Sequence, residues 1–453
     1  MKLFHYKAGV LHADCVPLNV IADAVGTPTY VYSANALRDA ARRFQAALAG
    51  VPRKHIAFAV KANPNRAVLH LLATEGFGAD IVSGGELAAA LDAGMAAETI
   101  IYSGTGKTPA ELAAALSAGI GQFNIELEAE GQLLSSLAVE RRLRAPATLR
   151  INPDIDARTH AKITTGRAAS KFGVPVTQAI DSYDRLAALP GLDLRGIAVH
   201  IGSQIVDLAP LEAAYGRVGE FLGALRQRGH VVTHVDLGGG LGVSYKIGEP
   251  GADIEAYGAM VERLTSDWNV TLQFEPGRLI AAEAGVLLTR VTWVKPGTEY
   301  PFVIVDAAMN DLMRPALYDA WHEFAAVRPR GMRLIANIVG PVCETGDTFA
   351  QAREIDQVEG GDLAVFHTAG AYGATMASTY NCRALPAEVL VDGDQFAVTA
   401  QRLEVSAIAR QRFAPWQTSG EAVRSPGKLS PPSHDGELGH APGQSHFSVL
   451  KRL

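Results

Sequence analysis

A single lysine stands where a short apolar segment of the sequence ends. The run 56–60 predicts a buried strand, Lys61 follows it directly, and the residues at 63–65 (Asn-Pro-Asn) are typical of a turn. A lysine at a strand end lies in a partly dry setting, where its neutral amine is easier to reach. Lys61 is therefore a candidate to form a Schiff base with a carbonyl compound, with a solvated strand-end lysine as the alternative.

Other residues with chemical potential also stand in or beside apolar runs. Asp80, His200 and Glu275 belong to three separate runs, and the glycines Gly238–Gly240 follow a fourth. Consecutive glycines let backbone N–H groups approach an anion such as phosphate, although a tight turn would also use them. Glu275 can pair with a cation such as a pyridinium nitrogen, or with nearby Arg278. A lysine, a phosphate-binding glycine run and a carboxylate for a ring nitrogen together indicate a pyridoxal phosphate site.

A regular series of elements must position these residues. Between residues 27 and 282, short β-type runs alternate with Ala- and Leu-rich helical segments such as 34–48, which has one apolar face. The predicted strands are 56–60, 79–82, 99–102, 122–125, 147–151, 196–201, 233–237 and 271–275. Eight such units predict an α/β fold, a (β/α)8 TIM-type barrel whose strand ends converge on one rim. A doubly wound open sheet is the alternative.

The pattern changes after the eighth predicted strand. Apolar runs at 286–294, 300–305, 334–339, 362–366 and 396–399 predict strands without regular helices between them. We expect a mostly antiparallel β domain (a β-sandwich or barrel) formed by residues 283–416 together with 1–26. Residues 417–453 are rich in Ser, Gly and Pro and predict a flexible tail. Its histidines, His434, His440 and His446, lack accompanying cysteines or acidic clusters, so we predict no metal site.

The composition restricts the classes of function. The chain has 453 residues, of which 48% are apolar and 19% charged, and its net charge of −6 argues against a nucleic-acid partner. No apolar run approaches the ~18 residues of a membrane span, and the start does not resemble a signal peptide, so we expect a soluble cytoplasmic protein. Cys15, Cys343 and Cys382 cannot form a disulfide framework, which leaves room for one functional thiol.

Longer motifs relate the sequence to a known family. They are VKANPN (60–65), GADIVSGGEL (78–87), NPDIDARTHAKITTG (152–166), SKFG (170–173), HIGSQ (200–204), GGGLG (238–242), EPGR (275–278), MNDLMRPALYDAWH (309–322), GPVCETGD (340–347) and GAYG (370–373). On these motifs, residues 10–416 resemble the barrel-type, alanine-racemase-like pyridoxal-phosphate enzymes, and among them the diaminopimelate decarboxylases.

The resemblance implies a role for each residue around pyridoxal 5'-phosphate. Lys61 would bind the cofactor covalently and later exchange protons, Glu275 would keep the ring nitrogen protonated, and His200 would stack on the ring. Ser203, Gly238, Gly239, Gly240 and Tyr372 would bind the phosphate, and the cofactor site would also include Asp80, Pro276, Gly277 and Arg278.

The resemblance further implies that meso-2,6-diaminopimelate is converted to L-lysine and CO2, the last step of lysine biosynthesis. This substrate carries two carboxylates and two ammonium groups, so its site needs cations for the retained carboxylate and an anion for the distal ammonium. Arg278, Arg314, Tyr318 and Tyr372 would serve the carboxylate. The four-residue spacing of Arg314 and Tyr318, with Pro315 at a helix start, lets both face one way, although a surface pair would have the same spacing.

Two residues of the GPVCETGD motif carry the remaining roles that the resemblance implies. Glu344 would bind the distal ammonium, and Cys343 would protonate the carbon that has lost CO2. In the family both residues reach the active site of a partner subunit, which implies a homodimer with shared active sites.

Three other functions remain open from the sequence. A decarboxylase of ornithine, arginine or a carrier-bound amino acid would not need Arg278, Arg314 and Tyr318 together. An amino-acid racemase suits an arginine at the ring nitrogen rather than Glu275. A non-catalytic pyridoxal-phosphate carrier resembles the barrel alone.

Overall fold

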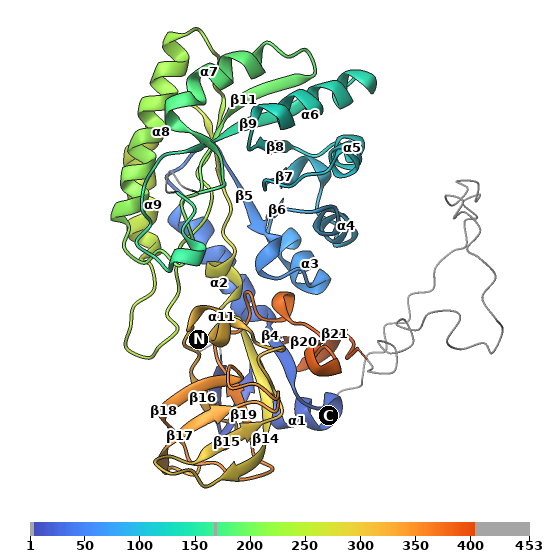
Figure 1. Ribbon diagram of the computed structural model, residues 1–453, viewed down its shortest axis with the longest axis vertical. Helices are drawn as coiled ribbons and strands as arrows, with labels where there is room; N and C mark the ends of the chain where they lie inside the picture. Colours follow the sequence, from blue (N-terminus) through green and yellow to red (C-terminus); the bar gives the residue numbers. More distant parts are fainter. Residues whose placement is uncertain (1–3, 167–169, 404–453) are drawn as a thin grey trace, which may run out of the picture.

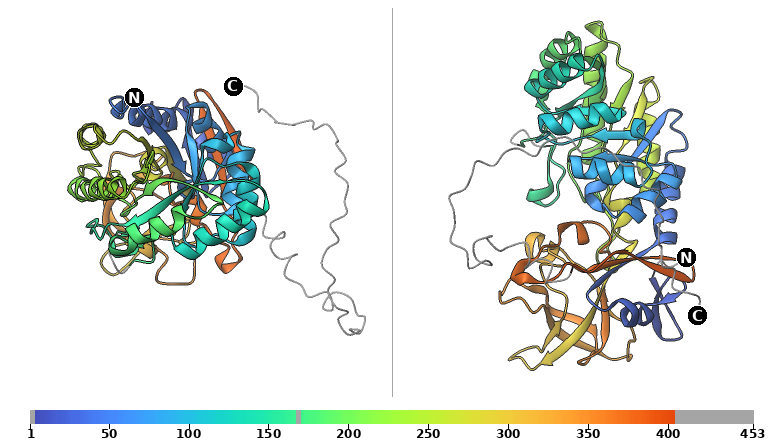
Figure 2. Two further views of the ribbon diagram at one scale, coloured as in Figure 1. Left: turned by 90° about the horizontal axis from the view of Figure 1, so that it is seen from above. Right: turned by 90° about the vertical axis from the view of Figure 1, so that its right-hand side faces the viewer.

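The computed structural model describes residues 4–166 and 170–403, which form two domains stacked along the long axis of the molecule (Figures 1 and 2). The predicted tail 417–453 with its three histidines lies outside the described residues, as do residues 404–416 of the expected β domain. One domain is a barrel, and the other is a β domain with strands from both ends of the described chain.

Eight parallel strands form the barrel in the upper half of Figure 1. They are β5 (Lys54–Ala59), β6 (Gly78–Ile81), β7 (Ile100–Tyr102), β8 (Gln122–Ile125), β9 (Ala145–Asn152), β11 (Leu192–Ala198), β12 (His234–Asp236) and β13 (Thr271–Phe274). The pairs β13–β5 and β8–β9 close the ring, and the short β10 (Val174–Pro175) pairs with β9. This closure confirms the predicted barrel and excludes an open doubly wound sheet.

Helices connect the strands and cover the outside of the barrel (Figure 1). They are α2 (Ala34–Ala47), α3 (Arg66–Thr74), α4 (Gly84–Asp92), α5 (Pro109–Ala118), α6 (Glu128–Glu140), α7 (Val176–Ala187), α8 (Ala209–Gln227), α9 (Ile254–Thr265) and α10 (Arg278–Ala281). In α2 the predicted apolar face, including Leu37, Ala41 and Phe44, is buried, and the Ser33 hydroxyl caps the helix by accepting from the Ala36 N–H. No helix of the described residues is both long and apolar enough to cross a membrane.

The β domain is built on one large sheet. Its strands are β4 (Thr29–Ser33), β14 (Gly285–Lys295), β15 (Phe302–Val305), β16 (Phe324–Ala326), β17 (Arg333–Val339), β18 (Thr348–Asp356), β19 (Leu363–Phe366), β20 (Ala387–Asp392) and β21 (Gln395–Ala400). Most pairs are antiparallel, while β15–β17 and β20–β4 are parallel. The sheet therefore has the mostly antiparallel character that the sequence predicts, with β16, β18 and β20 as additional strands.

The position of β4 differs from the sequence expectation, which starts the barrel at residue 27. In the structure β4 pairs with β14 on one side and β20 on the other. All five of its residues are buried. A strand buried on both faces has no alternation that would distinguish a barrel strand from a central strand of another sheet. Only pairing with strands far along the chain decides its place.

The first described residues pack against the β domain. The strands β1 (Phe4–Lys7), β2 (Val10–Ala13) and β3 (Val16–Pro17) form a small antiparallel sheet, followed by α1 (Leu18–Val25). The Leu11 N–H donates to the Val327 carbonyl at 2.8 Å. Leu18 and Ile21 are buried in a core cluster that also contains Val286 of β14.

The two domains meet at the barrel rim, beside the turn that carries Lys61. The Tyr372 N–H donates to the Ala62 carbonyl at 2.8 Å, and Asn63 Nδ2 donates to the Gly370 carbonyl at 2.9 Å. Residues of both domains therefore fix the backbone on either side of this lysine.

Candidate active site

Lys61 lies in a 3-10 turn (Val60–Ala62) directly after β5, with its amine facing the barrel interior. Its Nζ is 2.6 Å from Oδ2 of Asp80, a fully buried residue of β6. Burial alone lowers the pKa of Lys61, but the attraction of Asp80 and Glu275 outweighs it and raises the pKa above its ordinary value. The expectation that a dry setting makes the neutral amine easier to reach is wrong here, because the ion pair keeps Lys61 protonated.

Three buried carboxylates, Asp80, Asp236 and Glu275, form a group below called the carboxylate cluster. Glu275 Oε1 accepts hydrogen bonds from Ser103 Oγ at 3.2 Å and Asn124 Nδ2 at 3.4 Å, and Asn124 also donates to Asp236 at 3.0 Å. Burial, followed by the nearby charges of Asp236 and Asp80, raises the pKa of Glu275 well above its ordinary value.

The carboxylate cluster needs more positive charge than Lys61 supplies. The second carboxylate oxygen of Asp80 (Oδ1) is buried and has no hydrogen-bond partner among the described residues. Burial also raises the pKa of Asp236. A protonated ring nitrogen would supply the missing cation, so this end of the site fits a pyridinium ring.

The glycine run after β12 forms a narrow cradle. Gly238 and Gly240 have φ values of +67° and +115°, and a Cβ at Gly239 would lie 2.1 Å from the Glu275 carbonyl oxygen. Side chains are therefore excluded, which leaves room for a phosphate to approach the backbone. Two of the N–H groups are already engaged, because Gly238 donates to Asp236 and Gly239 to His200. The same pocket is lined by Ser203, Pro276, Gly277 and Tyr372.

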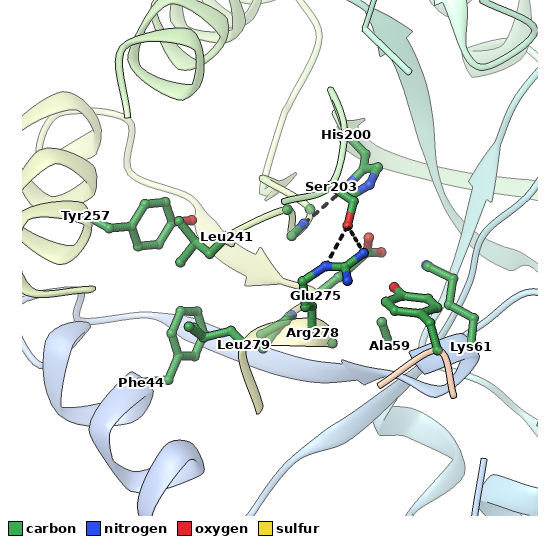
Figure 3. Close-up of a pocket in the computed structure, with 16 residues that line it drawn as sticks. Phe44, Ala59, Lys61, His200, Ser203, Leu241, Tyr257, Glu275, Arg278 and Leu279 are labelled. Carbon is green, nitrogen blue, oxygen red and sulfur yellow. Dashed lines mark hydrogen bonds between the residues drawn. The ribbon is translucent and has the colours of Figure 1, made fainter. Parts of the chain in front are cut away.

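His200, two residues beyond β11, lies partly buried against this cradle (Figure 3). Its Nδ1 accepts the Gly239 N–H at 3.2 Å, so Nδ1 carries no proton and the ring is neutral. Burial, then the charges of Arg150 and Lys61, lowers the pKa of His200 well below its ordinary value. A neutral imidazole in this position suits stacking on an aromatic ring.

A second cavity, below called the substrate cavity, shares lining residues with the cradle and has a volume of about 340 Å³. It is lined by Lys61, His160, Ile163, Thr165, His200, Ser203, Gln204, Tyr245, Arg278, Arg314, Tyr318, Ala320, Trp321, Tyr372 and Met376. Among these described lining residues there are two arginines and a lysine but no carboxylate. Its electrostatic character therefore favours an anion.

Arg278 at the start of α10 and Arg314 at the start of α11 (Arg314–Tyr318) are each 6% exposed. Arg278 donates to Ser203 Oγ at 3.0 and 3.3 Å and to the Tyr245 hydroxyl at 2.6 Å (Figure 3 shows the Ser203 contacts). The Arg314 guanidinium lies 4.4 Å from the centroid of the Tyr245 ring. Tyr245 thus contacts both arginines, although no sequence motif identifies it as a site residue.

The loop after β9 reaches across the cavity to α11. The His160 ring packs edge-on against Tyr318 with centroids 5.9 Å apart, and Lys162 Nζ donates to the Leu317 carbonyl at 2.9 Å. Pro315 stands in the first turn of α11, as its spacing predicts. The contact places Tyr318 on the cavity wall together with Arg314.

Cys343 and Glu344 are not brought into the cavity of their own chain. Both are exposed, in the turn between β17 and β18, and neither is among the described residues that line the cradle or the substrate cavity. Glu344 accepts a hydrogen bond from the Tyr380 hydroxyl at 3.0 Å. The other predicted site residues converge on the barrel rim.

Comparison with known proteins agrees with this geometry. Residues 36–282 match the family described as pyridoxal-dependent decarboxylase, pyridoxal binding domain. The chain is 52% identical over 410 residues to diaminopimelate decarboxylase of Zymomonas mobilis, covering 90% of this chain and 97% of that protein. The solved structure of diaminopimelate decarboxylase from M. jannaschii with L-lysine superposes with a TM-score of 0.88 at 32% identity, covering 91% of this chain and 98% of that one. The Helicobacter pylori enzyme with L-lysine gives a TM-score of 0.84 at 35% identity, covering 87% and 98%.

The barrel, the cofactor cradle and the family match define a pyridoxal-dependent decarboxylase. This confirms the predicted enzyme class and cofactor. Because identity is high over nearly the whole length of the relatives, the chain belongs to the diaminopimelate decarboxylase family.

Proposed function

We propose that this protein uses pyridoxal 5'-phosphate to decarboxylate meso-2,6-diaminopimelate to L-lysine and CO2, the last step of lysine biosynthesis. The observation that carries the proposal is the substrate cavity, where two buried arginines without a carboxylate partner among the described residues face the same space as Lys61. A retained carboxylate of the substrate would complete the charge of these arginines.

The residues around the cradle would hold the cofactor. Lys61 would bind it covalently, Glu275 would face the ring nitrogen, His200 would lie on the ring, and the glycine run with Ser203 and Tyr372 would take the phosphate. When bound, pyridoxal phosphate supplies an electron-withdrawing ring that accepts the electron pair left by departing CO2. Asp80 would keep the Lys61 amine oriented and hold its proton near the reacting carbon, because the two groups are 2.6 Å apart.

The substrate would be oriented by its retained carboxylate. Arg278 and Arg314 would bind this group from the cavity wall, with Tyr318 and Tyr372 beside them. A racemase is not favoured, because Glu275, the residue proposed to face the ring nitrogen, carries a carboxylate instead of a guanidinium.

We further propose a homodimer with shared active sites. The described lining of the cavity has no carboxylate for the distal ammonium of the substrate. Glu344 and Cys343 are exposed outside their own cavity, as residues that serve a partner subunit would be. Glu344 would bind the ammonium, and Cys343 would protonate the carbon that has lost CO2.

The direct test is to incubate the holoenzyme separately with meso-diaminopimelate, ornithine and arginine and to measure CO2 release. We expect release from meso-diaminopimelate alone, with L-lysine as the product. Faster release from ornithine or arginine would contradict the proposed substrate.

A further inference from the structure

Buried cations elsewhere in the barrel are neutralised by carboxylates. Lys107 Nζ is 2.7 Å from Glu130, and Arg150 Nη1 is 2.7 Å from Glu126. A buried cation without such a partner is costly, because water no longer solvates it. These two buried cations thus follow the usual rule for buried charge, whereas the arginines of the substrate cavity do not.

At Arg314 the partner is a histidine instead of a carboxylate. Arg314 Nη1 lies 3.0 Å from Nε2 of His322, which is 1% exposed. His322 Nδ1 lies 2.8 Å from the His367 carbonyl oxygen. A carbonyl oxygen can only accept, so Nδ1 must carry the proton and Nε2 must accept from Arg314. The imidazole is therefore neutral in the geometry that the structure shows.

The surroundings of His322 keep it in this state. Burial, followed by the positive charge of Arg314, lowers the pKa of His322 to about 3. The Tyr245 ring packs edge-on against it with centroids 5.3 Å apart, and Arg353 Nη1 donates to its backbone carbonyl at 2.5 Å. The ring is thus held by contacts on several sides, and it stays uncharged over the whole physiological pH range.

We propose that His322 is a positioning residue that holds Arg314 through a neutral acceptor, so that the full charge of the guanidinium remains available to the carboxylate of the substrate. The inference rests on the proposed function. A carboxylate at this position would satisfy the same hydrogen bond but would also neutralise Arg314 and compete with the substrate. Arg278 is also held by neutral acceptors, since it donates hydrogen bonds to the hydroxyls of Ser203 and Tyr245.

The test compares three substitutions of His322. His322→Gln keeps a neutral acceptor, His322→Phe fills similar space without an acceptor, and His322→Glu introduces an anionic one. Each holoenzyme is titrated calorimetrically with L-lysine, which carries a carboxylate, and with 1,5-diaminopentane, which carries none. The visible absorption of bound cofactor verifies that each variant retains a folded site.

We expect the affinity for L-lysine to fall least in His322→Gln, by about tenfold in His322→Phe and by more than that in His322→Glu, because charged hydrogen bonds to a carboxylate are lost or opposed. The affinity for 1,5-diaminopentane should change little in all three. The KM for meso-diaminopimelate should rise in the same order, with a smaller change in kcat.

Equal losses for the two ligands would overturn the inference, because they would indicate general damage to the cavity. Equal lysine affinities of the three variants would overturn it as well. If His322→Glu does not retain cofactor, the comparison of the L-lysine affinities of His322→Phe and His322→Gln still tests the inference. A wild-type enzyme that neither binds L-lysine nor decarboxylates meso-diaminopimelate would instead contradict the proposed function.

Discussion

The carboxylate cluster inside the barrel and the substrate cavity at its rim differ in the charge that each leaves unbalanced. The cluster has three carboxyl groups, those of Asp80, Asp236 and Glu275, but a single cation, Lys61. In the substrate cavity, by contrast, the described hydrogen-bond partners of Arg278 and Arg314 are all neutral. Both regions are buried, so neither excess is screened well by water.

This difference indicates that each region is complete only when its ligand is bound. The cluster lacks a cation, which the protonated ring nitrogen of the cofactor would supply. The cavity lacks an anion, which the carboxylate of the substrate would supply. Lys61 lies at the boundary, since it pairs with Asp80 and also lines the cavity. Substitutions in the two regions should therefore affect different properties.

Lys61→Ala should have the largest effect, because it removes the group at the boundary. We expect loss of the visible absorption of covalently bound cofactor and a decrease in decarboxylation of roughly 10³-fold or more. Borohydride reduction of the wild-type holoenzyme, followed by peptide mapping, should place the cofactor on Lys61. A label on a peptide without Lys61 would refute the assignment.

Glu275→Gln should retain the cofactor but lose most of the activity. The neutral amide no longer favours a protonated ring nitrogen, and kcat should fall by roughly 10²- to 10³-fold. The affinity for L-lysine should change far less, because the arginines are untouched. Near-normal turnover in this variant would mean that the carboxylate cluster does not control the chemistry.

Mixing two inactive variants should restore part of the activity if each active site takes its Cys343 from a partner subunit. A heterodimer of Lys61→Ala and Cys343→Ala subunits has one intact site. Random exchange at equal concentrations should give roughly a quarter of wild-type activity. Lysine formation is assayed after dissociation and reassembly. Background activity after verified exchange would refute the shared site, and each variant mixed with itself is the control.

The smallest effect concerns stability of the cofactor-free protein. The pKa of Glu275 is higher in the folded protein than in the unfolded chain. The contribution of this side chain to the free energy of unfolding is therefore complete at a pH below its ordinary pKa, and it is lost as the pH rises through the folded-state pKa. The melting temperature of the cofactor-free wild type should therefore fall more than that of Glu275→Gln as the pH is raised from about 5 towards neutral. An identical pH dependence of the two melting temperatures would contradict an uncompensated negative charge in the carboxylate cluster.

The sequence predicts much of the barrel because its strands are short apolar runs, and parallel strand ends must meet at one rim. That rule alone brings Lys61, Asp80, His200 and Glu275 together. Asp236 is missed, although a carboxylate at a strand end, one residue ahead of three glycines, is a signal that could have identified it.

Tyr245 and His322 could not be predicted in the same way. Both lie in irregular segments, where no period of the sequence fixes the direction of a side chain. His322 belongs to a long family motif, yet nothing in the motif indicates that its ring accepts a hydrogen bond from Arg314. These contacts depend on how the β domain packs on the barrel rim, which is a tertiary property.

The central place of β4 in the β domain has a consequence for synthesis of the chain. Thr29–Ser33 leaves the ribosome early, but its partners β14 and β20 follow the whole barrel. At roughly 5–20 residues per second, β20 emerges roughly 20–70 s after β4. During that interval an apolar, β-prone segment has no partner, while the barrel can already fold behind it. Protection of β4 from association with other nascent chains is therefore a requirement that this connectivity places on the cell.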